Sequence, residues 1–302
     1  MTYPIIIIPD SFKKAKEKLP ELPPEPTKPD KPDTSLKGCS LWLVLGVLMF
    51  FVMLMNFGAN NNNYDESLLI INLIGLLGLI PIFIWLHNNK KKRTYKKSVY
   101  EKELEVLPIK IEEYKKKVQD VLSPENLQKF REQELKKIIQ LSSGAKHLER
   151  FVNQGKYEQH FLSYLNKYFP DKIITSVSLG YFENPYAPDF AFIDRDSGLH
   201  IDIEIDEPYI SQSKEPIHFV GADDNRNYFF SSNNWVVIRF AEVQVAKQPL
   251  SCCKVIANTV YEIIGDKAHL NNLSAIEDLE PVNCWTYEDS LFLAHQNYRE
   301  IY

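Results

Sequence analysis

Cysteine is scarce in this sequence, with only 4 in 302 residues. The four cysteines, Cys39, Cys252, Cys253 and Cys284, form no C-x-x-C motif and show no Cys/His ligand spacing, which argues against a zinc centre. We expect the adjacent pair Cys252 and Cys253 to be reduced and to lie near the edge of a core, as suits a cytosolic compartment. No internal repeat is visible.

Charge is absent from two long stretches, residues 41–57 and 68–86. At about 1.5 Å per residue, each helix would be roughly 25–29 Å long, close to the thickness of a bilayer core. The alternatives are a pair of buried helices in a soluble domain, or a signal peptide for the first stretch. A signal peptide has a shorter apolar region and a cleavage site with small residues. The two stretches therefore predict a transmembrane helical hairpin.

Lysine and arginine are absent from the connector between these stretches, "GANNNNYDES" at residues 58–67. In contrast, Lys37 precedes the first stretch, and a cluster between Lys90 and Lys97 follows the second. Because positively charged flanks remain on the cytoplasmic side, we expect an integral membrane protein with two spans. Both termini and the C-terminal domain would then face the cytoplasm.

These patterns divide the chain into four segments. Residues 1–37 are rich in proline and predict an extended cytosolic tail, and residues 38–88 hold the hairpin. Residues 89–142 are charged and favour helix, with Ser123 as an N-cap before Pro124, and predict a helical stalk. The stalk could pair with another copy of the chain to give a homo-oligomer, although its apolar seam is too irregular to indicate a coiled coil.

Residues 143–302 have the composition of a globular domain, with periodic patterns in the order α-β-β-β-α-β-α-α. This order predicts an α/β domain with a mixed sheet flanked by helices. Within it, "LHIDIEID" at residues 199–206 alternates strictly, so its leucine and isoleucines share one face of a strand. The other face carries His200, Asp202, Glu204 and Asp206.

Carboxylates on one strand face lie only about 7 Å apart and repel one another. A divalent cation such as Mg²⁺ or Mn²⁺ would neutralise them, since such ions prefer oxygen ligands. The alternative is a solvent-exposed edge strand whose acids discourage aggregation. Asp189 favours the cation, because a hairpin turn at residues 196–198 can bring Asp189 and Glu204 to the same depth on one sheet face.

These residues resemble a known motif. Pro188–Asp189, followed by Glu204-Ile205-Asp206, is similar to the PD-(D/E)XK nuclease superfamily. More narrowly, the order of a strand with two acids, a D-x-x-R helix and a W-x-V-x-R-F strand resembles the very-short-patch-repair-like branch. In this chain the later elements are Asp223, Arg226, Trp235, Val237, Arg239 and Phe240. The resemblance spans roughly residues 150–265.

The resemblance implies a restriction-endonuclease-like fold and metal-dependent hydrolysis of phosphodiester bonds in DNA. It implies that Asp189 and Glu204 bind Mg²⁺ or Mn²⁺, with a backbone carbonyl near Ile205 as a further ligand. It also gives Glu158 the place of a first-helix acid that supports the metal or its water. The alternative for Glu158 is an ordinary exposed helix residue. No nucleotide cofactor is expected.

The sequence departs from the wider superfamily at Asp206, which stands where a lysine is usual. In the very-short-patch branch an acid is normal there and histidine does part of the work, which makes His218 a candidate for proton transfer near neutral pH. Arg226 and Lys214 are candidate phosphate contacts. The alternatives are a packing histidine, an intrahelical pair of Arg226 with Asp223, and a solvated lysine. Gln244 is a weaker candidate for the site, and we expect His200 to be structural.

The charge balance argues against a strong non-specific DNA-binding protein. The chain has 40 Asp and Glu against 35 Lys and Arg, and the excess acid lies in residues 143–302. Nucleic-acid binding depends largely on phosphate neutralisation, so proteins that do it are usually basic. The sequence therefore leaves two classes open: a membrane-anchored DNA nuclease, or a catalytically inactive nuclease-like module that binds or senses a ligand.

Overall fold

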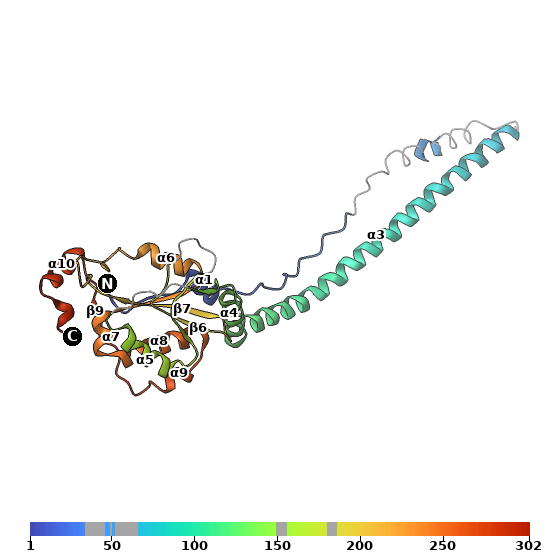
Figure 1. The fold of residues 1–302 in the computed structure, drawn as a ribbon. Coiled ribbons are helices and arrows are strands. Elements are labelled where there is room, and N and C mark those ends of the chain that lie inside the picture. The colour runs from blue at the N-terminus through green and yellow to red at the C-terminus, as the bar shows by residue number, and fades with distance from the viewer. Residues whose placement is uncertain (34–45, 49, 52–65, 149–155, 180–185) are drawn as a thin grey trace. The chain divides into compact units, whose positions relative to one another are not determined.

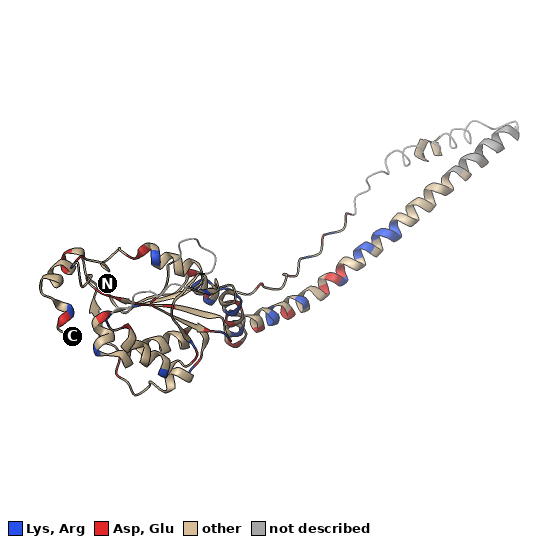
Figure 2. Cartoon of the chain, viewed as in Figure 1, with Lys and Arg blue, Asp and Glu red and all other residues tan. Residues whose placement is uncertain are grey.

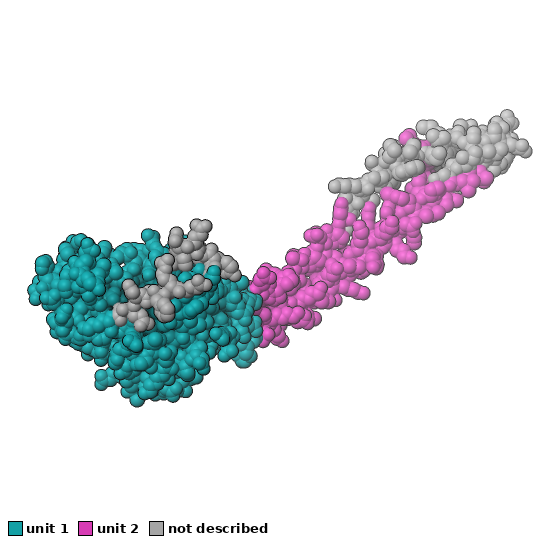
Figure 3. Space-filling model, viewed as in Figure 1, with its two compact units in different colours: residues 1–20, 123–302 teal, residues 21–122 magenta. Residues whose placement is uncertain are grey.

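The computed structural model describes residues 1–33, 46–48, 50–51, 66–148, 156–179 and 186–302. The chain divides into two compact units, shown in different colours in Figure 3. Unit 1 combines Met1–Pro20 with Ser123–Tyr302, and unit 2 is Glu21–Leu122. The globular unit is therefore discontinuous in sequence, and its second segment begins at Ser123, before the boundary at residue 143 that the sequence predicts.

A five-stranded mixed sheet forms the centre of unit 1, with the strand order β2-β8-β7-β6-β4. β7 and β8 are parallel, and the other neighbours are antiparallel. The strands are β2 (Ile5–Ile7), β4 (Ile173–Ile174), β6 (Phe190–Asp194), β7 (Leu199–Asp206) and β8 (Val236–Ala241). Two smaller sheets pair β1 (Thr2–Tyr3) with β9 (Val282–Asn283) and β3 (Ala145–His147) with β5 (Val177–Leu179). The predicted mixed sheet is present.

Helices flank this sheet, as Figure 1 shows. The helices of unit 1 are α1 (Asp10–Glu17), α4 (Pro124–Ile139), α5 (Glu158–Tyr168), α6 (Asp224–Ser232), α7 (Glu242–Lys247), α8 (Pro249–Ile264), α9 (Ala268–Asn271) and α10 (Tyr287–His295), followed by the 3₁₀ turn Tyr298–Glu300. α4 begins as the sequence predicts, since the Ser123 hydroxyl accepts a hydrogen bond from the Asn126 N–H. Four strands, β4 to β7, come between α5 and α6 in the chain, where the sequence predicts three, and α6 and β8 then follow in the predicted order.

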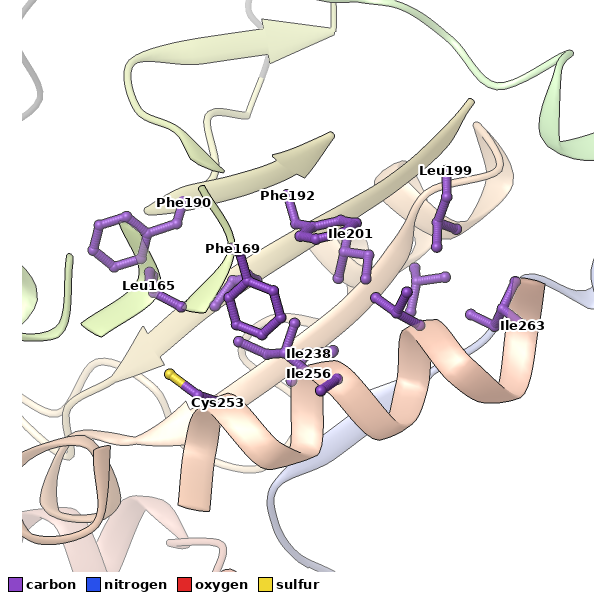
Figure 4. Packing of buried hydrophobic residues seen from close by; sticks show 14 of the residues in the cluster. Leu165, Phe169, Phe190, Phe192, Leu199, Ile201, Ile238, Cys253, Ile256 and Ile263 are labelled. Atoms are coloured by element: carbon purple, nitrogen blue, oxygen red, sulfur yellow. The ribbon is translucent and has the colours of Figure 1, made fainter. Parts of the chain in front are cut away.

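The main core lies between the sheet and the helices α5 and α8. Leu199 and Ile201 on β7 are fully buried and belong to one cluster with Leu165 of α5 and Ile256 of α8, all four of which are labelled in Figure 4. Burying each such side chain contributes about 1.5–3 kcal/mol. The aliphatic face of β7 is therefore fixed toward these helices, and the acidic face must point to the opposite side of the sheet.

The N-terminal segment differs from the predicted extended tail. Residues Ile5–Ile7 pair with β8 at the edge of the sheet, and α1 packs against α4 with Phe12 fully buried. Proline is tolerated at an edge-strand boundary, so Pro4 and Pro9 can bracket an isoleucine run that pairs with β8. The residues up to Pro20 thus belong to unit 1.

The predicted membrane anchor is wrong. Within the part of the chain that the structure describes, no helix has both the length and the apolar character needed to cross a bilayer. The second apolar stretch does not form a helix of its own but continues into the lysine-rich residues and the predicted stalk as one helix, α3 (Glu66–Val121). Most of the first stretch, residues 41–57, lies outside the described residues. The two-span topology and the integral-membrane localisation are corrected accordingly.

Truncating Phe12 tests the placement of the N-terminal segment. Because its ring is fully buried between α1 and the main core, Phe12→Ala should lower the free energy of unfolding of the full chain by about 3–5 kcal/mol. Lys14→Ala, at an exposed position of the same helix, should change it by less than about 0.5 kcal/mol. Urea denaturation measures both. Equal stabilities for Phe12→Ala and the wild type would contradict the inclusion of residues 1–20 in unit 1.

Candidate functional site

The acidic face of β7 is buried. Asp202, Glu204 and Asp206 are each at most 2% exposed. β7 lies between β6 and β8 and is therefore not an edge strand, which excludes the reading of its acids as a device against edge-to-edge aggregation. Three buried carboxylates on one strand require positive partners, because an unpaired buried charge costs several kcal/mol.

Asp189 lies on the same side of the sheet as Glu204. The β6–β7 hairpin pairs Phe190 with Ile203, so the preceding residue, Asp189, stands opposite Glu204. The Asp189 Oδ2 accepts a hydrogen bond of 2.8 Å from the Ile205 N–H. Burial and the negative charges of Glu204 and Glu158 raise the pKa of Asp189 well above its usual value. Three of the acids that the sequence singled out are thus close enough to influence one another.

The guanidinium of Arg226 provides the positive charge beside these carboxylates. From α6, its Nη2 donates to Glu204 Oε1 at 2.5 Å and to the Ala187 carbonyl. Burial alone would raise the pKa of Glu204, but the charge of Arg226, a hydrogen bond with protonated Asp202 and the charge of Arg239 together outweigh it, and the pKa is lowered. Glu204 is therefore ionised at neutral pH. Arg226 pairs with this sheet residue rather than forming the intrahelical pair with Asp223 that the sequence left open.

Asp202 is left without a donor. Both of its carboxylate oxygens and the Arg226 Nε are buried and have no hydrogen-bond partner among the described residues. Burial and the neighbouring Glu204 charge raise the pKa of Asp202 well above its usual value. A buried carboxylate beside an ionised one can be satisfied in two ways: by a proton shared with Glu204, or by a cation bound to both.

A second cluster surrounds Asp206. Arg239 on β8 donates from Nε and Nη2 to the two Asp206 oxygens at 2.8 and 2.6 Å. The same guanidinium lies 3.1 Å from Asp223 Oδ2, which also contacts His218 Nδ1 at 2.9 Å. One ligand atom each from Asp206, His218 and Asp223 lies within 4.8 Å of the others, which makes them a possible metal-binding triad.

His218 carries a proton at neutral pH. Its burial opposes the charge, but the hydrogen bond to Asp223 and the charge of Asp206 prevail and raise the pKa to about 9. The imidazolium can donate a proton to a leaving group, but it cannot accept one from water. The sequence leaves open whether His218 accepts or donates a proton, and the raised pKa favours the role of proton donor.

Two other candidates lie away from these clusters. The Lys214 ammonium donates to Asn297 Oδ1 and lies over the Tyr209 ring, so it is not brought to the acidic face. Gln244 is a buried structural residue, since its side chain bonds the Ala241 N–H and the carbonyls of Tyr3 and Glu280. His200, as expected, is structural and packs against the Trp235 ring at 4.9 Å.

The structure adds residues to the site that the sequence did not assign to it. Arg239 neutralises Asp206, the position at which the resemblance lacks its usual lysine. The sequence of β8 could have indicated this, because Arg239 is the one charged residue in an otherwise apolar strand. Tyr3 hydrogen-bonds Asp206 from more than 200 residues away, and no local pattern in the sequence indicates that contact.

Comparison with known proteins found no matching family model, no matching curated protein and no matching solved structure. The chemistry of the site is therefore argued from its own residues.

The pKa of His218 predicts a pH-dependent stability. Since the pKa in the folded chain, about 9, exceeds the usual histidine pKa of 6.5, the contribution of His218 to stability is complete below pH 6.5 and is lost as pH rises through 9. The loss should approach roughly 3 kcal/mol. Urea denaturation of the full chain at several pH values measures it. His218→Asn should abolish this dependence, and His295→Asn, at an exposed position, should retain it; superimposable profiles for the wild type and His218→Asn would refute it.

Proposed function

We propose that unit 1 is a metal-dependent nuclease that hydrolyses phosphodiester bonds of DNA. One observation carries the proposal: Asp189 and Glu204 face the same side of a central sheet, with the donor-less carboxylate of Asp202 beside them. Support also comes from the order of the elements and from α6 and β8, which bring Arg226 and Arg239 to the acidic face.

The donor set has the chemistry that Mg²⁺ or Mn²⁺ prefers, although among the described residues only Asp206, His218 and Asp223 bring one ligand atom each within 4.8 Å of the others. Asp189, Asp202 and Glu204 offer only carboxylate oxygens, the ligands that hard divalent ions prefer. The buried Asp202 and Glu204 and the partly buried Asp189 face one arginine, Arg226, so the local charge remains negative when all three ionise. Asp189, Asp202 and Glu204 would hold the ion, with Glu158 adding to the negative field. When bound, such an ion lowers the pKa of a coordinated water and stabilises charge on a phosphate.

The Asp206 triad is a weaker place for the ion. Arg239 occupies both oxygens of Asp206 and also contacts Asp223, and His218 is protonated at neutral pH. Two cations thus balance two carboxylates without any metal. We therefore assign the ion to Asp189, Asp202 and Glu204.

The chain's own residues have distinct roles in this proposal. The His218 imidazolium is held by Asp223 and Asp206 and donates a proton to the leaving oxygen. Arg226, whose Nε has no partner within the described chain, supplies a donor for a non-bridging phosphate oxygen. Each such charge-assisted bond contributes about 1.5–3 kcal/mol.

A second candidate is a nuclease-like module that binds a ligand without cleaving it. It is favoured by the two arginine pairs, Arg226 with Glu204 and Arg239 with Asp206. These pairs already neutralise the acids at two of the motif positions. The excess of acidic over basic residues also favours this candidate, because it weakens non-specific DNA binding.

Plasmid cleavage by the full chain with Mg²⁺ or Mn²⁺ tests the proposal. Asp189→Asn and Glu204→Gln remove one charge each with little change in shape, and each should lower the cleavage rate by roughly 100-fold or more. Glu215→Gln, on an exposed loop outside the site, should cleave like the wild type.

The outcomes separate the two candidates. Equal cleavage by all four proteins would overturn the nuclease assignment to these residues. A wild type that does not cleave but gains thermal stability from Mn²⁺, with the gain lost in Asp189→Asn, would favour the binding module.

A further inference from the structure

Unit 2 contains one long helix whose C-terminal part is not buried by the rest of the described chain. α3 extends over 56 residues from Glu66 to Val121, and a helix of that length with a sustained pattern is typical of a coiled coil. Figure 2 shows basic and acidic residues side by side along its C-terminal part. None of the residues 100–121 is buried.

The apolar residues of this part form a regular seam. Their spacing alternates between three and four residues, the heptad pattern that places them on one stripe of the helix. The seam consists of Tyr100, Leu104, Leu107, Ile111, Tyr114 and Val118. Pro108 lies outside it, and so does Ile109, which is 60% exposed on another face. The whole stalk looks irregular in the sequence because apolar residues such as Ile109 also occur off the seam.

We infer that this seam pairs with the same seam of a second copy of the chain in an antiparallel coiled coil. The two-fold symmetric register places Leu104 opposite Tyr114 and Leu107 opposite Ile111, while Tyr100 meets Val118. Each layer then combines two different side chains, so that the aromatic residues are distributed among aliphatic ones. The seam becomes buried on both copies at once, which a symmetric interface requires.

Charge complementarity selects the antiparallel direction. In this register the flanking residue Glu103 meets Lys117 of the other copy, and Glu101 meets Lys115. The two-fold axis repeats both pairs, and among the flanking residues Lys110 and Pro108 each meet the same residue of the other copy. In a parallel pair, Lys110 would instead lie next to Lys115 of the other copy, and Glu103 would lie next to Pro108. Flanking charges of this kind determine partner and orientation in coiled coils.

These flanking side chains are available for a partner. Glu103 and Lys117 are both exposed. Glu101 lies 3.6 Å from Lys97, and both of those side chains are more than half exposed. The inference concerns unit 2 alone, so it is independent of the proposed nuclease activity.

Sedimentation equilibrium of the full chain measures the pairing. The wild type should be a dimer, and Ile111→Asp should raise its dissociation constant by roughly 100-fold or more, because it places a charge in the seam of both copies. Ile109→Asp is the matched control: the same substitution on another face of the same helix should leave the dissociation constant within about threefold of the wild type. A monomeric wild type, or equal effects of the two variants, would overturn the pairing of copies and leave the seam to a helix of another protein.

Charge reversal tests the direction. Glu103→Lys and Lys117→Glu should each raise the dissociation constant by about three- to tenfold, because each turns an attractive pair into a repulsive one on both sides of the dyad. The double variant should restore the wild-type value. Failure of the double variant to recover, or no effect of either single reversal, would overturn the antiparallel arrangement.

Discussion

The burial of three carboxylates on one face of β7 is the constraint on which unit 1 depends. Asp202, Glu204 and Asp206 are all at most 2% exposed, and an unpaired charge at such a position costs several kcal/mol. Neighbouring elements supply the compensation. α6 places Arg226 on Glu204, and β8 places Arg239 on Asp206, while the opposite face of β7 is fixed by its aliphatic contacts with α5 and α8. The acidic face of β7 therefore requires α6 and β8 as neighbours, and its aliphatic face requires α5 and α8.

This compensation is unequal along the strand. Asp206 has a bidentate arginine, the protonated His218 nearby and a hydrogen bond from Tyr3. Asp202 has no hydrogen-bond donor among the described residues, and burial together with the charge of Glu204 raises its pKa well above the usual value. A cation bound beside Asp202 would favour its ionised form, whereas Asp206 is already paired with Arg239. For this reason the proposed ion belongs with Asp189 and Glu204 rather than with the triad around His218.

Local patterns in the sequence are sufficient to predict much of the structure of unit 1. Strict alternation gave the two faces of β7, and the short turn after Asp194 gave the hairpin that sets Asp189 opposite Glu204. Contacts between distant residues were not predictable in this way. Nothing near Tyr3 indicates its bond to Asp206, and nothing near Lys214 indicates that its side chain turns toward Asn297. Such contacts depend on tertiary packing, which a single sequence does not encode locally.

Two predictions from the sequence are wrong for the same reason: a change in composition does not mark the end of an element. The proline-rich composition of residues 1–37 predicts an extended tail, but residues 1–20 form two strands and a helix that belong to unit 1. A run without charge was read as a separate membrane helix, although in the structure it continues without a break into the charged part of α3. Helix ends are set by capping and by breaks in hydrogen bonding, and a change in composition alone does not supply them.

Binding of Mn²⁺ to the full chain, measured by the loss of the free-ion electron paramagnetic resonance signal, tests the central claim most directly. The account predicts binding by the wild type and by His218→Asn, with affinity lowered at least about tenfold in Asp202→Asn and Glu204→Gln. Binding that is lost in His218→Asn but retained in Asp202→Asn would place the ion in the Asp206 triad and contradict the account.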